Sequence, residues 1–316
     1  MQIFLQVLLL IVGFVFLVKG SDWFVDGAAE IAEKFGIPQL IIGLTIVAMG
    51  TSAPEAAVSI TAAFNGSADI TIGNIVGSNI LNVLIILGLS AVVFPLVVKK
   101  NSIVVDIPVT IAATVLLLVQ GIDGNITRID GIIMLISFIS YLIFLFFSAK
   151  KGNTDSIEMP EDNNMSLPKA ILLTIIGLAL IIAGSNFVVK SASFIARAFG
   201  WSERFIGLTI VALGTSLPEL FTSVSAAYKK NCDIAIGNII GSNLFNILFV
   251  VGLSSVIIDV PFRPEFRIDT LVALASMLLL FFFCLPKNKM GMRKLTRVGG
   301  VIFLISYCLY FGLYLI

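Results

Sequence analysis

Long apolar runs alternate with short polar breaks along the whole chain. A transmembrane helix needs about 20 mostly apolar residues to cross roughly 30 Å of hydrocarbon. Ten stretches are long enough, near residues 2–19, 38–64, 70–94, 103–121, 129–148, 168–189, 204–228, 233–258, 268–286 and 297–316. The first could pass for a signal peptide, but "MSLPKAILLTIIGLALIIAG" repeats its pattern in mid-chain, where no signal peptide can lie. The pattern therefore predicts an all-α integral membrane protein with ten transmembrane helices.

The sequence repeats itself with an offset of 164 residues. Between Gly43 and Leu89, 27 of 47 positions are identical to the residues 164 positions later. Each half then carries five predicted spans, an odd number, so the second half must enter the membrane in the opposite orientation. We expect two inverted five-helix repeats, residues 1–148 and 168–316, joined by a polar linker at 149–167. Such repeats are a transporter architecture, with the substrate site at the repeat interface.

Composition narrows the class of protein. Hydrophobic residues make up 58% of the chain and charged residues 12%, far below the roughly 25% of soluble domains. The net charge of +1, without a clustered basic region, gives no footprint for nucleic-acid binding. Because the chain has no histidine, a zinc site or proton relay built on histidine is excluded. The three scattered cysteines do not form the pattern of a disulfide framework.

The distribution of positive charge predicts the orientation. When each Lys and Arg is assigned to its nearest loop, the loops after the odd-numbered spans hold 14 of the 20 and the alternate loops hold 6. Positive charge gathers on the cytoplasmic side of membrane proteins. We therefore expect a multi-pass protein of the cell membrane, with both termini extracellular and the central linker cytoplasmic.

A proline and a glutamate interrupt one span of each half, in "GTSAPE", which ends at Glu55, and "GTSLPE", which ends at Glu219. Pro54 has no N–H for the carbonyl four residues earlier, so we expect the helix to kink and to free backbone carbonyls there. Thr51 and Ser52 lie on roughly the same helix face as Glu55. A carboxylate inside the bilayer costs about 2.5–3.5 kcal/mol on insertion scales, so each glutamate needs a partner.

A second polar element follows on the next span of each half, "GNIVGSNILN" and "GNIIGSNLFN". Asn74, Ser78 and Asn82 form one helix stripe, which their counterparts repeat. Gly73 and Gly77 have the small-xxx-small spacing that lets helix backbones approach closely, and so do their counterparts.

Other polar residues of these spans have simpler interpretations. We expect Asn74 and Asn238 to serve packing or capping more than ion binding. Asp69 and Asp233 stand where helix N-caps are expected.

Together the motifs supply carboxylate, hydroxyl and carbonyl oxygens, without sulfur or imidazole. Such oxygen sets favour hard cations such as Ca²⁺, Na⁺ and Mg²⁺ over zinc or copper. Two carboxylates neutralise one Ca²⁺, and the same oxygens can hold Na⁺ ions in turn, which suggests exchange. The simpler alternative is a protonated structural pair of glutamates. A passive channel and an intramembrane enzyme are disfavoured, because the polar groups cluster at one level and no His or Cys nucleophile–base set is present.

The paired motifs, "GLTIVAMGTSAPE" with "GNIVGSNILN" and "GLTIVALGTSLPE" with "GNIIGSNLFN", resemble the two alpha-repeats of the sodium/calcium exchanger family, particularly its short prokaryotic members. The resemblance covers nearly the whole chain. It implies antiport of Na⁺ and Ca²⁺ by alternating access, normally extruding Ca²⁺, with helices one and six sliding across the remaining bundle. Antiport of Ca²⁺ against H⁺ or another cation on the same fold is the alternative, since a buried glutamate can carry a proton. No enzyme activity, cofactor or obligate protein partner is implied beyond the ions and the lipid bilayer.

The resemblance also implies a set of ion ligands. Glu55 and Glu219 would be shared by Ca²⁺ and Na⁺, carbonyls of the threonines would complete the Ca²⁺ shell, and serine hydroxyls with alanine carbonyls would line flanking Na⁺ positions. The implied set is Glu55, Glu219, Thr51, Thr215, Ser52, Ser216, Ser78, Ser242, Asn82, Asn246, Ala48 and Ala212. Some relatives have an aspartate at one of the two central asparagine positions. Potassium co-transport goes with an acid at the position of Asn246, so the resemblance argues against it here.

Overall fold

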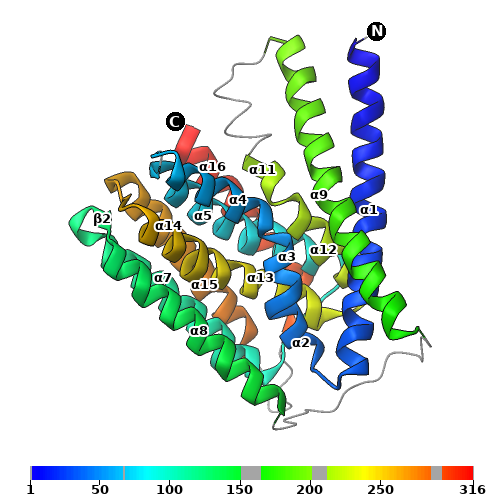
Figure 1. The fold of residues 1–316 in the computed structure, drawn as a ribbon, viewed down its shortest axis with the longest axis horizontal. Coiled ribbons are helices and arrows are strands. Elements are labelled where there is room, and N and C mark those ends of the chain that lie inside the picture. The colour runs from blue at the N-terminus through cyan, green and yellow to red at the C-terminus, as the bar shows by residue number, and fades with distance from the viewer. Residues whose placement is uncertain (1, 67, 151–164, 201–211, 286–293, 316) are drawn as a thin grey trace.

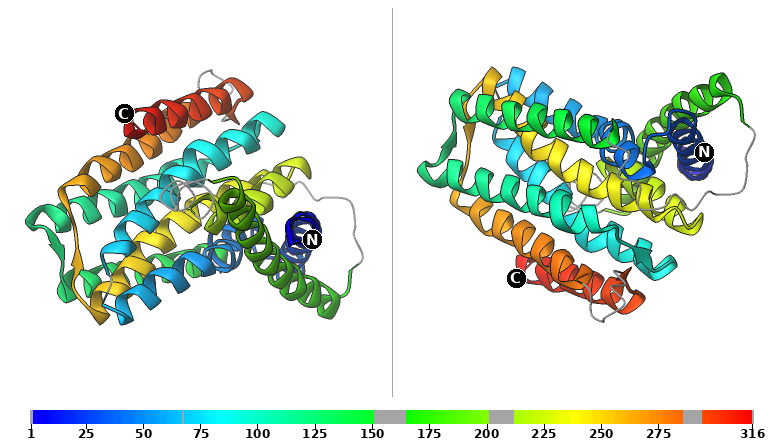
Figure 2. Two further views of the ribbon diagram at one scale, coloured as in Figure 1. Left: turned by 90° about the horizontal axis from the view of Figure 1, so that it is seen from above. Right: turned by 90° about the horizontal axis from the view of Figure 1, so that it is seen from below.

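The computed structural model describes residues 2–66, 68–150, 165–200, 212–285 and 294–315, and almost all of them are helical. The two longest helices, α1 (Gln2–Lys34) and α9 (Leu167–Ala198), lie side by side at one edge of the molecule (Figures 1 and 2). Their backbones are in close contact through glycines. A Cβ atom on Gly20 would lie 2.8 Å from the carbonyl oxygen of Gly177. Small residues are what such close helix pairs need inside a membrane.

Both long helices continue well past the ends predicted at residues 19 and 189. The polar stretches that follow the apolar runs contain no proline, so helical hydrogen bonding continues through them. The helices end only near Gly36 and Gly200, whose φ angles of +61° and +81° are left-handed. Glycine adopts this conformation without a steric penalty, which makes it the usual helix terminator.

The second predicted span is broken into α2 (Gln39–Ile42), the π-helix η1 (Gly43–Val47), α3 (Ala48–Thr51) and α4 (Ala53–Phe64). The axis bends by 51° between α3 and α4, which confirms the kink predicted from Pro54. In the second half α11 (Ala212–Thr215) and α12 (Leu217–Tyr228) are separated in the same way at Ser216. The beginning of this predicted span, up to residue 211, lies outside the described residues.

Two helical rods form the centre. The first is α5 (Asp69–Leu81), the π-helix η2 (Asn82–Leu87) and α6 (Gly88–Val93), and the second is α13 (Cys232–Leu244), the π-helix η6 (Phe245–Val251) and α14 (Gly252–Ile257). They are the most buried of the candidate spans. Both contain a π-helical segment at the equivalent place, a feature that often marks functional positions.

The remaining helices cover this centre. In the first half these are η3 (Ser102–Asp106), α7 (Ile107–Gln120), the short 3₁₀ turn η4 (Gly121–Asp123) and α8 (Arg128–Lys150), and in the second half α15 (Pro264–Cys284) and α16 (Arg297–Leu315). Helix α15 packs against α5 and α7, α8 packs against α14, and α16 packs against α6.

Two small antiparallel ladders join the halves. Strand β1 (Leu96–Val97) pairs with β4 (Lys294–Leu295), and β2 (Asn125–Ile126) pairs with β3 (Val260–Pro261). Each ladder therefore takes one strand from each half.

By length and composition, seven helices of the described chain could cross a membrane, or eight if the bent pair 39–64 counts as one span. The all-α membrane class is thus confirmed, whereas the number ten is not reached. Two predicted spans account for the difference. Both lie partly outside the described residues, the one near 204–228 at its beginning and the one near 297–316 at its end.

Candidate cation-binding site

The two repeated glutamates lie in the first turns of the helices that follow the breaks. Glu55 stands at the start of α4 and Glu219 at the start of α12, directly after the prolines, and each side chain is only 1% exposed. The proline is tolerated at this position because the first helical N–H groups have no intrahelical partner. The breaks therefore present both carboxyl groups inside the protein.

Each glutamate is bonded by the serine of the other half. Ser52 Oγ donates to Glu219 Oε1 at 2.7 Å, and Ser216 Oγ lies 3.2 Å from Glu55 Oε1. Ser216 Oγ also lies 3.4 Å from Ser78 Oγ. The sequence placed each serine on the face of its own glutamate, and the structure adds that the hydrogen bonds cross between the halves. The crossing brings both motifs into one site.

The second oxygen of each glutamate is left without a hydrogen-bond partner among the described residues. These atoms are Glu55 Oε2 and Glu219 Oε2, and both are fully buried. Neither glutamate forms an ion pair with a described Lys or Arg. A buried carboxylate without compensation is penalised by several kcal/mol. The pair therefore needs a cation or a proton, and the described chain adds no third Asp, Glu, Cys or His to the cluster.

The remaining hydroxyls surround the pair. Thr215 interacts with Glu55, and Thr51 and Ser242 interact with Glu219. Ser242 Oγ also lies 3.4 Å from the carbonyl oxygen of Ala48, which places that carbonyl beside the site. Ala212 opens α11, and its side chain lies outside the described residues.

Asn74 and Asn238 brace the glutamate helices. Asn238 Nδ2 donates to Ser223 Oγ at 2.9 Å, and its Oδ1 accepts from Thr51 Oγ1 at 3.0 Å. Asn74 Nδ2 donates in the same way to Ser59 Oγ at 3.0 Å and to the carbonyl oxygen of Glu55 at 3.3 Å. These contacts fit the predicted packing role.

The helix-capping prediction for Asp233 is wrong. Asn231 caps α13, with its Oδ1 accepting from the N–H of Ile234, whereas Asp233 forms a 2.6 Å ion pair with Lys99. Because the helix already begins at Cys232, Asp233 lies in its first turn, past the cap position. The side chain of Asp69 lies outside the described residues.

The close-packing prediction for the glycine pairs holds in the second half. A Cβ atom on Gly237 would lie 2.8 Å from the carbonyl oxygen of Leu40, and one on Gly241 would lie 2.5 Å from that of Leu44. Among the described residues, a Cβ atom on Gly73 would meet the ring of Phe266 at 3.4 Å. The segment that would pack on the first pair by repeat symmetry, 204–208, lies outside the described residues.

Asn82 and Asn246 begin or enter the π-helices, one turn beyond Ser78 and Ser242, and both are buried. Their Oδ1 atoms have no partner among the described residues. Their Nδ2 atoms donate hydrogen bonds to the side-chain oxygens of Asn243 and Asn79, respectively. The sequence analysis did not single out these two residues. The signal was available, because "GSN" is identical in both halves.

Ser185 is a further residue not anticipated. Pro218 leaves the carbonyl of Gly214 without its helical N–H, and Ser185 Oγ of α9 donates to that oxygen at 2.6 Å. One of the freed carbonyls is therefore taken by a neighbouring helix. The equivalent hydroxyl, on Ser21 of α1, bonds within its own helix to Val18.

Taken together, the site collects carboxylate, hydroxyl, amide and carbonyl oxygens inside the protein. This donor set suits hard cations with flexible oxygen shells, Ca²⁺ and Na⁺ among them.

Comparison with known proteins points the same way. A family model described as "Sodium/calcium exchanger protein" matches residues 5–147 and 169–315. The chain is 38% identical to the putative antiporter CaxA of Alkalimonas amylolytica, over 94% of both chains. It is 33% identical to the sodium/calcium exchanger MaX1 of Methanosarcina acetivorans, over 87% of this chain and 90% of that protein.

A solved structure agrees in fold. The sodium-calcium exchanger NCX_Mj, from a crystal soaked with Na⁺ and Sr²⁺, superposes with a TM-score of 0.85 at 36% identity, covering 98% of this chain and 99% of that one. Motifs, donor chemistry and fold therefore converge on one conclusion. The chain belongs to the sodium/calcium exchanger family, a family of membrane transporters.

Proposed function

We propose that this protein exchanges Na⁺ for Ca²⁺ across the cell membrane by alternating access and normally extrudes Ca²⁺. The observation that carries the proposal is the pair of buried glutamates, one from each half, each with an unpartnered oxygen and a crossed serine bond. One Ca²⁺ neutralises both charges, and Na⁺ ions can replace it on the same oxygens. The sodium/calcium exchanger MaX1 and NCX_Mj support this assignment by likeness.

The proposed ligands are the twelve residues implied by the motifs, with Glu55 and Glu219 at the centre. The hydroxyls of the four serines, with the carbonyls of Ala48 and Ala212, would line the Na⁺ positions. The carbonyls of Thr51 and Thr215 would complete the Ca²⁺ shell. Asn82 and Asn246 would contribute the two unpartnered amide oxygens.

The proposed architecture is ten spans in two inverted repeats, residues 1–148 and 168–316, joined by the linker 149–167. The reciprocal exchange of strands and of serine bonds between the halves supports it. By the positive-inside rule the linker is cytoplasmic and both termini are extracellular. Alternating access would come from α1 and α9 sliding together, and their close packing on each other supports a movement as one unit.

Ca²⁺/H⁺ antiport is the second candidate. One oxygen of each glutamate accepts a serine bond while the other has no partner among the described residues, so the free oxygen could hold a proton as well as a cation. The hydroxyl groups around each glutamate favour Na⁺ as the counter-ion.

Flux in liposomes tests the two. Purified protein is reconstituted in vesicles preloaded with Na⁺, and uptake of ⁴⁵Ca²⁺ is followed after dilution into Na⁺-free medium. Na⁺-driven exchange predicts uptake that needs the outward Na⁺ gradient and stops when an ionophore dissipates it. Vesicles with the Glu55→Gln variant are the matched control and should take up no more than empty vesicles. Uptake that follows a pH gradient and ignores Na⁺ would contradict the proposal and favour the second candidate.

A further inference from the structure

Four buried asparagines, two from each half, form hydrogen bonds to one another. Asn79 Nδ2 donates to the carbonyl oxygen of Asn243 at 3.2 Å, and Asn243 Nδ2 donates to that of Asn79 at 3.4 Å. The outer pair is attached to this inner pair. Asn246 Nδ2 donates to Asn79 Oδ1 at 3.1 Å, and Asn82 Nδ2 donates to Asn243 Oδ1 at 2.9 Å.

The backbone carbonyls fix which way every amide points. A carbonyl can only accept, so the amide of Asn79 must turn its NH₂ group to Asn243. Its oxygen then faces Asn246, and because this oxygen also only accepts, Asn246 must present its NH₂ group. The oxygen of Asn246 consequently points away from the set. The same sequence of steps, with the halves exchanged, orients Asn82.

We infer that Asn79 and Asn243 are positioning residues for ion binding. They hold the amides of Asn246 and Asn82 so that two oxygens, and not two NH₂ groups, face the cation. This inference rests on the proposed function. An amide free to rotate would turn its NH₂ donors toward a cation in part of the population and weaken binding.

Double-mutant cycles on ion affinity test the inference. Asn79→Leu should weaken Ca²⁺ binding about tenfold, the effect of losing one oriented ligand, and should add less than about twofold in an Asn246→Ala background. In an Asn82→Ala background, whose amide is held by Asn243, the same substitution should keep its full effect. Affinity is measured per folded protein by equilibrium dialysis of ⁴⁵Ca²⁺, which a loss of stability alone does not change.

Equal losses in all three backgrounds, or no loss from Asn79→Leu, would overturn the inference while leaving the exchanger assignment intact. Asn243→Leu with Asn82→Ala is the symmetric cycle and decides the result if one variant fails to fold. If the unmodified protein binds neither Ca²⁺ nor Na⁺, the proposed function fails, and the inference with it.

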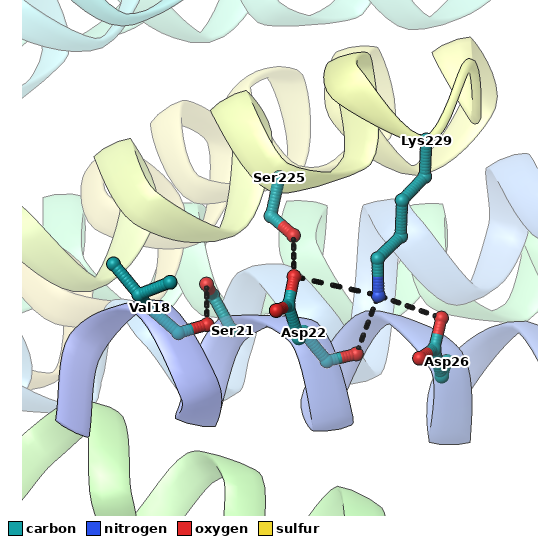
Figure 3. A network of polar contacts seen from close by, with 6 residues as sticks. All are labelled: Val18, Ser21, Asp22, Asp26, Ser225 and Lys229. Carbon is teal, nitrogen blue, oxygen red and sulfur yellow. Dashed lines mark hydrogen bonds and ion pairs between the residues drawn. The ribbon is translucent and has the colours of Figure 1, made fainter. Parts of the chain in front are cut away.

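A second observation concerns the contact between α1 and α12 (Figure 3). Lys229, just after the end of α12, has its Nζ 2.8 Å from Asp26 Oδ1, 3.5 Å from Asp22 Oδ1 and 2.9 Å from the carbonyl oxygen of Asp22. Ser225 Oγ donates to Asp22 Oδ1 at 2.9 Å. One lysine thus ties two turns of a long edge helix to the helix that carries Glu219.

The equivalent positions of the other half have no such complement. With the offset of 164, Asp22 and Asp26 correspond to Asn186 and Lys190 on α9, and Lys229 corresponds to Asn65 at the end of α4. Helix α9 packs on α11, α12 and α3. No described helix covers the groove between α4 and the start of α5, whereas α1 covers the matching surface of α12. The groove is lined by Ala57, Val58, Thr61, Ala62, Asn65 and Ile70.

We propose that Lys229, Asp22 and Asp26 form a latch that favours the observed arrangement over the opposite one, in which α9 would lie on α4. The opposite arrangement would bring Lys190 near Asn65, without an ion pair. The three side chains are 26%, 36% and 45% exposed, so the latch is a modest bias and can open during each transport cycle. This proposal rests on alternating access as proposed above.

Disulfide cross-linking measures the two arrangements without any transport. The three native cysteines are first replaced by alanine. The pair Phe14→Cys with Phe221→Cys then reports the observed arrangement, in which the centroids of the two phenylalanine rings are 6.3 Å apart. The equivalent pair, Leu178→Cys with Ala57→Cys, reports the opposite one. Lys229→Asn, the residue found in the other half, should lower the ratio of the first yield to the second about two- to fivefold.

A latch built on the other side is the matched control. Asn65→Lys with Asn186→Asp and Lys190→Asp should lower the same ratio while Lys229 stays in place. Unchanged ratios in Lys229→Asn and in Asp26→Asn would overturn the latch. If the second pair never cross-links in any variant, alternating access by these helices is refuted instead.

Discussion

At the residue scale, the centre of the proposed cation site is two carboxyl groups, each bonded by a serine of the other half. Glu55 and Glu219 lie in the core without a described basic partner, so a bound cation or a proton has to compensate their charge. Replacing either glutamate by glutamine should abolish exchange. It should also raise the melting temperature in ion-free buffer, because one buried charge is removed. Liposome flux checks the loss of exchange, and differential scanning fluorimetry with and without Ca²⁺ checks the change in melting temperature. A variant that melts lower in ion-free buffer but is still stabilised by Ca²⁺ would contradict the assignment.

The crossing of the serine bonds gives a second residue-scale prediction. Ser52→Ala should lose about 1.5–3 kcal/mol of interaction with Glu219, the range for hydrogen bonds to charged groups, and little with Glu55. In double-mutant cycles on Ca²⁺ affinity, Ser52→Ala should therefore couple to Glu219→Asp and add independently to Glu55→Asp. Ser216→Ala should show the reverse pattern. Coupling within a half instead of between halves would refute the crossed geometry.

At the element scale, the breaks in the helices could be predicted and their packing could not. Pro54 has no N–H to donate, so the kink at Ser52 follows from the sequence alone. The π-helical segments of the two central rods do not follow from the sequence. The length of α1 beyond residue 19 could not be predicted from hydropathy, because Asp22 and Asp26 are polar yet find partners on a helix 200 residues away. The orientation of Asn79 likewise depends on a contact with Asn243, which local pattern does not encode.

Glycine contacts make a prediction at the same scale. A Cβ on Gly237 would come 2.8 Å from the Leu40 carbonyl, so Gly237→Ala should lower the melting temperature even though alanine favours helices. Gly312→Ala in α16 is the control, because its Cβ would lie more than 4 Å from any described atom outside its own stretch of helix, and it should leave the melting temperature unchanged or raise it slightly. Thermal unfolding of both variants in the same detergent checks the difference. Equal destabilisation would show that backbone approach at Gly237 does not matter.

At the scale of the whole molecule, the halves are held together by non-covalent contacts as much as by the linker. The ladders, the asparagine set and the α1–α9 contact all join one half to the other. Residues 1–150 and 165–316 expressed as two chains should therefore assemble and co-purify. Co-purification from membranes and ⁴⁵Ca²⁺ flux of the product check this expectation. If the two separate chains do not co-purify although the intact protein folds, the linker does more than connect the halves.

The reciprocal bonds also bear on ancestry. Strand pairs with strand, serine with glutamate and asparagine with asparagine in both directions, so each contact is made twice. A surface that complements itself in this way is satisfied by two identical copies. With the halves inverted as proposed, a single unfused half inserted into the membrane in both directions could form every one of these bonds. In the fused chain the two copies can differ, as they do where Lys229 corresponds to Asn65.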